Sequence, residues 1–86
     1  MDSIQFPYHI RLPKYMGQAI REVRKEKKMT QEDLADITGT SMKFISNVEQ
    51  GKASVQMDKV IDLTRALGLQ IYLTREQGPG KENSNE

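Results

Sequence analysis

Residues 30–52, TQEDLADITGTSMKFISNVEQGK, hold the pattern that decides the fold of this chain. Thr30 can accept a hydrogen bond from a free N–H group at the start of a helix, and Asp33 stands where it can complete a capping box. Gly39 can adopt the left-handed conformation that ends a helix. Ser41 can then cap a second helix, so the stretch predicts two short helices joined by a tight turn.

The first short helix is expected over residues 31–38, and the second is closed by Gly51. Ala35 stands where two helices would touch, and Ile45 and Val48 provide apolar anchors after the turn. This spacing suits a helix-turn-helix, whose second helix can lie in the major groove of DNA.

Further helices are expected on both sides of this pair. Pro13 suits the first position of a helix because its φ is fixed and its missing N–H is not needed there. Helical spacing of apolar residues then continues to about Lys28. Another helix starts near Gln56 and ends at Gly68. Its inward stripe is expected to consist of Met57, Val60, Ile61, Thr64 and Leu67.

The segment after the last helix has a different period. Residues 69–74 alternate with a period of two and include aromatic and β-branched types, which predicts a strand over residues 69–75. A lone strand leaves its N–H and C=O groups unpaired. One possible partner is the alternating stretch at residues 4–10, and the other is the same strand of a second copy. We favour the symmetric pairing, because a small domain gains core by dimerising.

Three segments are therefore expected. Residues 1–12 form an extended N-terminal arm, and residues 13–76 form one mostly α-helical domain that includes the dimerisation strand. Residues 77–86 are expected to be a disordered tail, because GPGKENSNE has no apolar residue to bury.

Composition sets limits on function. The chain has 86 residues and a net charge of +1, so its total charge does not identify a polyanionic partner. The basic run from Arg21 to Lys28 is either a solvated helix face or a phosphate-facing patch. The chain lacks Cys, which excludes a disulfide framework and a Cys-type zinc site. No apolar run approaches the roughly 20 residues of a membrane span, and no secretion signal is recognisable, so a cytoplasmic chain is expected.

Catalytic patterns are not recognisable in this sequence. His9 is the only histidine, and it lies in the extended N-terminal stretch. The chain shows neither a glycine-rich phosphate loop, nor a histidine-based metal pair, nor a nucleophile elbow. We therefore expect a protein that is not an enzyme and that uses no cofactor or metal.

Residues from about 13 to 69 resemble the lambda-repressor-like domain of Cro and XRE-type bacterial regulators. The resemblance implies a helix-turn-helix bundle of four to five helices that binds operator DNA. The strand directly after the last helix is similar to that of HipB-type antitoxins, whose dimers share a sheet of C-terminal strands and bind a HipA-type kinase toxin. The matching residues are Ile20, Val23, Arg24, Thr30, Gln31, Leu34, Ala35, Gly39, Ile45, Ser46, Val48, Glu49, Gly51, Lys52, Leu67 and Gly68.

The resemblance also implies roles for particular residues. The positions that face base edges fall on Ser41, Met42, Lys43 and Asn47, with Ser46 close to the DNA backbone or a base. Lys43 can donate to guanine and Asn47 can pair with adenine, whereas Met42 offers only apolar contact.

Phosphate contacts are implied for Gln31 and Lys52. Arg24 either forms an ion pair with Glu49 or touches a phosphate. Dimerisation is implied for the strand through Leu69, Ile71, Tyr72 and Leu73.

Two apolar residues near the turn leave alternatives open. Phe44 either fills core space from the edge or rests against a sugar-phosphate chain, and Ile37 either packs inward or is exposed.

The leading hypothesis is a homodimeric, sequence-specific repressor that is the antitoxin of a HipA-type kinase toxin and regulates its own operon. A phage-type or restriction-controller repressor without a toxin partner is one alternative. A protein-interaction module on a helix-turn-helix scaffold is another.

Overall fold

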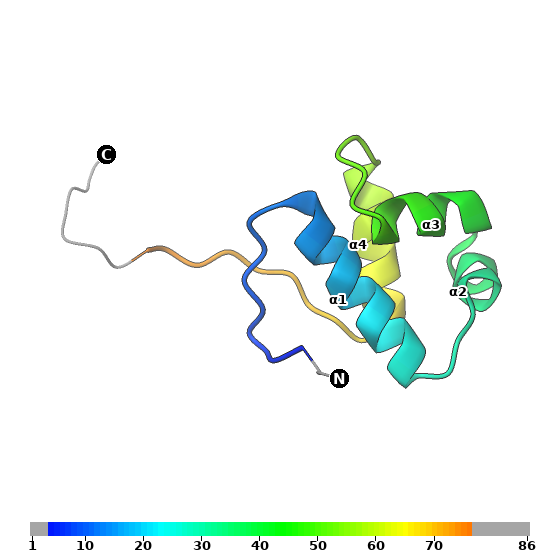
Figure 1. Cartoon of the computed structure of the whole chain (residues 1–86), viewed down its shortest axis with the longest axis horizontal. Helices are drawn as coiled ribbons and strands as arrows, with labels where there is room; N and C mark the ends of the chain where they lie inside the picture. The colour runs from blue at the N-terminus through cyan, green and yellow to red at the C-terminus, as the bar shows by residue number, and fades with distance from the viewer. Residues whose placement is uncertain (1–3, 77–86) are drawn as a thin grey trace.

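The computed structural model describes residues 4–76 of the 86. This range contains four helices: α1 (Pro13–Glu26), α2 (Gln31–Thr38), α3 (Met42–Glu49) and α4 (Met57–Ala66). α3 packs against both α1 and α2, and α2 also packs against α4 (Figure 1). The mostly α-helical fold predicted from the sequence is confirmed.

The turn between α2 and α3 has the predicted caps. The Thr30 hydroxyl accepts from the Asp33 N–H at 3.0 Å, and the Asp33 carboxylate accepts from the Thr30 N–H at 2.8 Å. Gly39 ends α2 with a φ of 68°, where a residue with a Cβ would be strained. The Ser41 hydroxyl then accepts from the Phe44 N–H at 3.0 Å. These local bonds fix where both helices begin.

α1 ends two residues earlier than predicted, at Glu26 instead of about Lys28. Lys28 has a φ of 61°, which is incompatible with a continuing right-handed helix. The Met29 N–H returns to the Arg24 carbonyl at 3.2 Å, and the Met29 side chain packs against the core. The early end therefore turns the chain so that α2 can start beside α1.

All four helices contribute to the core. Phe44 packs against its edge, so the core-edge alternative for this residue is the one that the structure shows. Ile37 is 64% exposed, which selects its exposed alternative. The largest fully buried side chains are Ile20, Leu34, Ile45, Leu63 and Leu67.

The predicted inward stripe of α4 is wrong at two positions. Met57 is 66% exposed and Ile61 is 40% exposed, whereas Leu63, absent from the prediction, is fully buried. Residues of a helix are 100° apart, and the true stripe is rotated away from both exposed residues. The buried side of the helix and its C-cap consist of Val60, Leu63, Thr64 and Leu67. α4 consequently keeps apolar side chains on its surface.

Gly17 sets the distance between α1 and α3. A Cβ at this position would collide with the Val48 carbonyl oxygen and lie 2.7 Å from the Glu49 carbonyl oxygen. Both atoms belong to backbone and cannot rotate away. The glycine that lowers the helix propensity of α1 therefore allows its close packing on α3.

Residues 69–76 leave the bundle as extended chain on the side away from α2 (Figure 1). No residue between 4 and 76 belongs to a strand in this single chain, so the strand predicted over 69–75 is not seen. Within the same range, residues 4–10 form no backbone hydrogen bond with it either. The tail predicted over residues 77–86 lies outside the described residues. No helix in the described range is both long and apolar enough to cross a membrane.

Candidate nucleic-acid interface

One side of α3 faces solvent and the other faces the core. On the inner side Ile45 is fully buried, Val48 is 4% exposed and Glu49 is 9% exposed. The outer side is polar apart from one methionine, and we call it the α3 surface. It consists of Ser41, Met42, Lys43, Ser46, Asn47 and Gln50, all exposed or partly exposed. The structure therefore brings all five predicted base-reading residues onto one surface.

The side chains of the α3 surface differ in whether their hydrogen-bonding groups are already used within the protein. Lys43 and Asn47 make no side-chain hydrogen bond within residues 4–76, and Met42 is 51% exposed. The Ser41 hydroxyl oxygen is already used as the cap of α3. The Ser46 hydroxyl oxygen accepts from the Gln50 side-chain amide at 2.9 Å. All side-chain hydrogen-bonding groups of Lys43 and Asn47 are thus available for contacts with base edges.

Gln50 is a surface residue that the sequence reasoning missed. It is the C-cap of α3, with φ −84° and ψ −2°, and its N–H still bonds the Ser46 carbonyl at 2.9 Å. Its helical backbone lets its side chain reach one turn back toward Ser46. The spacing of four residues between two polar side chains was the available signal.

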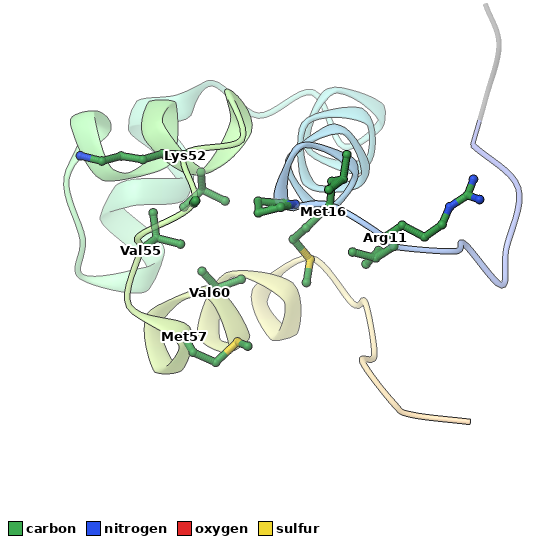
Figure 2. Close-up of a pocket in the computed structure, with 11 residues that line it drawn as sticks. Arg11, Met16, Lys52, Val55, Met57 and Val60 are labelled. Carbon is green, nitrogen blue, oxygen red and sulfur yellow. The ribbon is translucent and has the colours of Figure 1, made fainter. Parts of the chain in front are cut away.

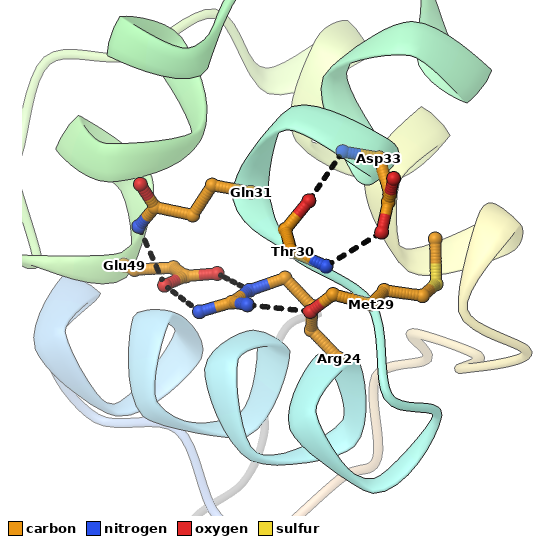
Figure 3. A network of polar contacts seen from close by, with 6 residues as sticks. All are labelled: Arg24, Met29, Thr30, Gln31, Asp33 and Glu49. Atoms are coloured by element: carbon orange, nitrogen blue, oxygen red, sulfur yellow. Dashed lines mark hydrogen bonds and ion pairs between the residues drawn. The ribbon is translucent and has the colours of Figure 1, made fainter.

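A buried ion pair joins α1 to the inner side of α3 (Figure 3). Arg24 donates from Nε to one oxygen of Glu49 at 2.7 Å and from a terminal nitrogen to the other at 3.0 Å. Its other terminal nitrogen donates to the Met29 carbonyl at 2.7 Å. The Arg24 and Glu49 side chains are only 8% and 3% exposed. The pair therefore joins α1, the loop before α2, and α3 in one network.

This burial decides between the two alternatives for Arg24. The structure shows the ion pair with Glu49, and the three short bonds direct the guanidinium into the protein. Two parallel charge-assisted bonds are also the arrangement that an arginine–carboxylate pair favours. Arg24 consequently acts in this structure as a scaffold residue that holds α1 and α3 together.

Gln31 connects the same network to the protein surface. Its side-chain amide donates one hydrogen to a Glu49 oxygen at 3.1 Å. The amide nitrogen carries a second hydrogen, and Gln31 is only partly buried, at the first position of α2. The start of a helix also favours an anion, because free N–H groups and the helix dipole both point toward it. Gln31 can therefore hold Glu49 and still donate outward.

Lys52 follows α3 at the start of the loop to α4. Its N–H bonds the Asn47 carbonyl at 3.0 Å, which holds the loop against the end of α3. Lys52 and Arg11 line an apolar groove of about 300 Å³ between the N-terminal arm, α1 and α4. Both charged side chains extend away from the groove, in opposite directions (Figure 2). The Lys52 ammonium group is thus available to solvent and to an approaching phosphate.

The fold and the exposed polar side of the second helix of the pair define a class, the helix-turn-helix DNA-binding transcriptional regulators of the Cro/XRE type. Residues 20–73 match the sequence pattern of the Helix-turn-helix family, and the chain belongs to this family. A relative from Sinorhizobium fredii, the uncharacterized HTH-type transcriptional regulator y4mF, is 37% identical over 72% of this chain and 82% of its own length.

Solved structures of related proteins have the same fold. HipB in an O4 20mer complex superposes with a TM-score of 0.73 at 25% identity, covering 80% of this chain and 97% of HipB. The restriction-modification controller protein C.AhdI from Aeromonas hydrophila superposes with a TM-score of 0.58 at 33% identity, covering 64% of this chain and 83% of its own. Several multiprotein-bridging factors also match, although this chain spans less than half of their length.

Proposed function

We propose that this regulator is a homodimeric, sequence-specific repressor that reads operator DNA with the α3 surface. The main observation in support is that all five predicted base-reading residues lie on the solvent side of α3, whose other side is anchored in the core. A rigidly held helix with a polar outer side fits the docking of a recognition helix in the major groove. Lys43 and Asn47 supply the base contacts that select the site.

Phosphate contacts would position this helix on the duplex. Gln31 and Lys52 lie on either side of α3 along the chain, one at the start of α2 and one in the loop after α3. Contacts to the DNA backbone orient a protein but carry no sequence information of their own. We therefore assign affinity to Gln31 and Lys52 and site selection to the α3 surface.

Dimerisation through residues 69–75 is the second part of the proposal. Ile71, Tyr72 and Leu73 are 45%, 65% and 96% exposed in the single chain. Exposed apolar side chains on extended backbone match a strand that lacks its neighbour. Pairing with the same strand of a second copy would satisfy the backbone groups, cover these side chains, and present two α3 surfaces to a palindromic operator.

The more specific hypothesis is an antitoxin of a HipA-type kinase toxin that also represses its own operon. It is supported by the structural similarity to HipB, which covers 97% of the HipB chain in the O4 20mer complex. The structure of a HipA–HipB–O2–O3 complex is similar to this chain to the same extent. A controller protein without a toxin is the second candidate, and the similarity to C.AhdI supports it. Stable co-purification with a kinase-like product of a neighbouring gene would favour the antitoxin, and its absence would favour the controller.

The DNA-binding proposal is tested by selecting duplexes from a random pool with the purified protein and measuring affinity for the selected site. Lys43→Ala and Asn47→Ala should each weaken specific binding by about 1–3 kcal/mol while the fold stays intact. Arg65→Ala, on the exposed surface of α4, is the control for loss of a positive charge. Wild-type affinity in both α3 variants would contradict the assigned surface, and failure to select any site would favour the protein-interaction module.

A further inference from the structure

Ser46 and Gln50 form a hydrogen-bonded pair of side chains on the α3 surface. Ser46 is one of the five predicted base-reading residues. Within residues 4–76, it is the only one of the five whose side chain forms a hydrogen bond with another side chain. The Gln50 amide nitrogen donates to the Ser46 hydroxyl oxygen at 2.9 Å, and this contact is exposed. Exposed polar side chains usually bond to water, so a bond between two of them restricts both.

The direction of this bond determines what the pair can offer. Because the Ser46 oxygen accepts from Gln50, its own hydrogen remains free to donate. Accepting one hydrogen bond also strengthens the donor capacity of the same hydroxyl. The Gln50 amide nitrogen keeps its second hydrogen as well. The pair therefore presents two donors whose heavy atoms lie 2.9 Å apart.

Two adjacent donors distinguish between base pairs. In the major groove guanine presents two neighbouring acceptors, N7 and O6, whereas adenine presents one acceptor and one donor. Cytosine presents a donor in its amino group. Two donors held side by side consequently match guanine and oppose an amino group.

We propose that Ser46 and Gln50 act together as one reader of guanine, with Gln50 both positioning the serine hydroxyl and contributing a donor of its own. This inference rests on the proposed DNA-binding function and adds Gln50 to its specificity-determining residues. Gln50 lies at the C-terminal end of α3, but its side chain leans one turn back, which brings its amide to the level of Ser46.

The test is base selection by the full-length protein and four variants, Ser46→Ala, Gln50→Met, the double variant, and Gln50→Lys. Gln50→Met keeps the length of the side chain and removes its hydrogen bonds. Ser46→Ala and Gln50→Met should each reduce the preference for guanine at the same single base pair by about two- to tenfold. The double variant should lose no more of its guanine preference than the single variant with the larger loss, because the two residues act as a unit.

Gln50→Lys should retain the guanine preference, because an ammonium group still donates to the serine oxygen and to a base acceptor. Gln56→Met is the control, since Gln56 is exposed and makes no side-chain capping bond at α4. Circular dichroism and thermal unfolding of each variant establish that α3 remains folded.

The outcomes separate this inference from the function on which it rests. Additive losses, losses at different base pairs, or a preferred base other than guanine would overturn the composite reader while leaving DNA recognition intact. Absence of any preferred sequence for the wild-type protein would instead overturn the proposed function.

Discussion

Each helix of the α2–α3 pair has eight residues, as many as the segment at residues 69–76, but the two regions differ in how they are stabilised. Each helix of the pair contributes a fully buried side chain, Leu34 from α2 and Ile45 from α3. In the C-terminal segment Leu73 is 96% exposed and Tyr72 is 65% exposed. The helix pair is therefore packed within one chain, whereas Ile71, Tyr72 and Leu73 of the segment remain exposed in it.

The two regions also differ in their polar groups. Both helices of the pair start from side-chain caps. The pair is held by a buried contact of Glu49 with Arg24 and a partly buried one with Gln31. Residues 71–76 take part in none of the backbone hydrogen bonds within the described range. The comparison teaches that a fully packed helix pair, which carries the proposed DNA-reading surface, coexists in this chain with an exposed segment, which carries the proposed dimerisation strand. The following substitutions test this difference between the two regions, in order of their expected effect on the unfolding free energy of one chain.

The largest effect is expected for Glu49→Ala. It leaves the buried Arg24 guanidinium without its carboxylate, and breaking one side of a buried pair costs about 3–5 kcal/mol. Urea unfolding followed by circular dichroism measures the loss. The control is Asp62→Ala, because the Asp62–Arg65 pair is 3.7 Å long and largely exposed. A loss for Glu49→Ala as small as that of the control would show that the network does not stabilise the helix pair.

Gly17→Ala should have the next largest effect. The added Cβ meets the carbonyl oxygens of Val48 and Glu49, which forces α1 and α3 apart. We expect a net loss of about 1–3 kcal/mol from overpacking, even though alanine favours a helix by about 1 kcal/mol. The same unfolding experiment measures it, with the exposed Arg21→Ala in the same helix as control. A stabilised Gly17→Ala protein would contradict the close approach of the two helices.

Ile71→Lys should change the stability of a single chain by no more than about 0.5 kcal/mol, because Ile71 is already 45% exposed. It should nevertheless shift a dimer toward monomer, since a charge replaces an apolar residue in the proposed shared strand. Sedimentation equilibrium over a concentration series measures the shift. Ile37→Lys makes the same replacement at another exposed isoleucine, in α2, and should leave the mass unchanged. An unchanged mass for Ile71→Lys would count against pairing through this strand.

The smallest effect on stability is expected for Lys52→Ala, which removes only an exposed side chain. Its effect should be seen in DNA binding, where losing one phosphate contact lowers the slope of log affinity against log salt by about 0.9. Binding to the selected duplex at several salt concentrations measures the slope. A slope equal to that of the wild type would remove Lys52 from the interface.

Most of the helix pair was predictable from the sequence because its signals are local. The capping residues Thr30 and Ser41 and the left-handed Gly39 act within one turn of the chain, and the structure has all three as predicted. The exposed positions of α3 were predictable too, because Ile45 and Val48 fix its orientation. The orientation of α4 was not, since several apolar residues allowed more than one stripe and packing against the other helices selected Leu63 over Ile61.

By itself, the sequence determined four helices, the caps at Thr30, Gly39 and Ser41, and a polar outer side on α3, because these properties depend on residues within about four positions of one another. Only the tertiary structure decided that Arg24 is buried against Glu49, 25 positions away, and that Gly17 permits the close packing of α1 on α3. It also decided which apolar residues remain on the surface. Such outcomes depend on distances between elements far apart in the chain, which local patterns do not contain.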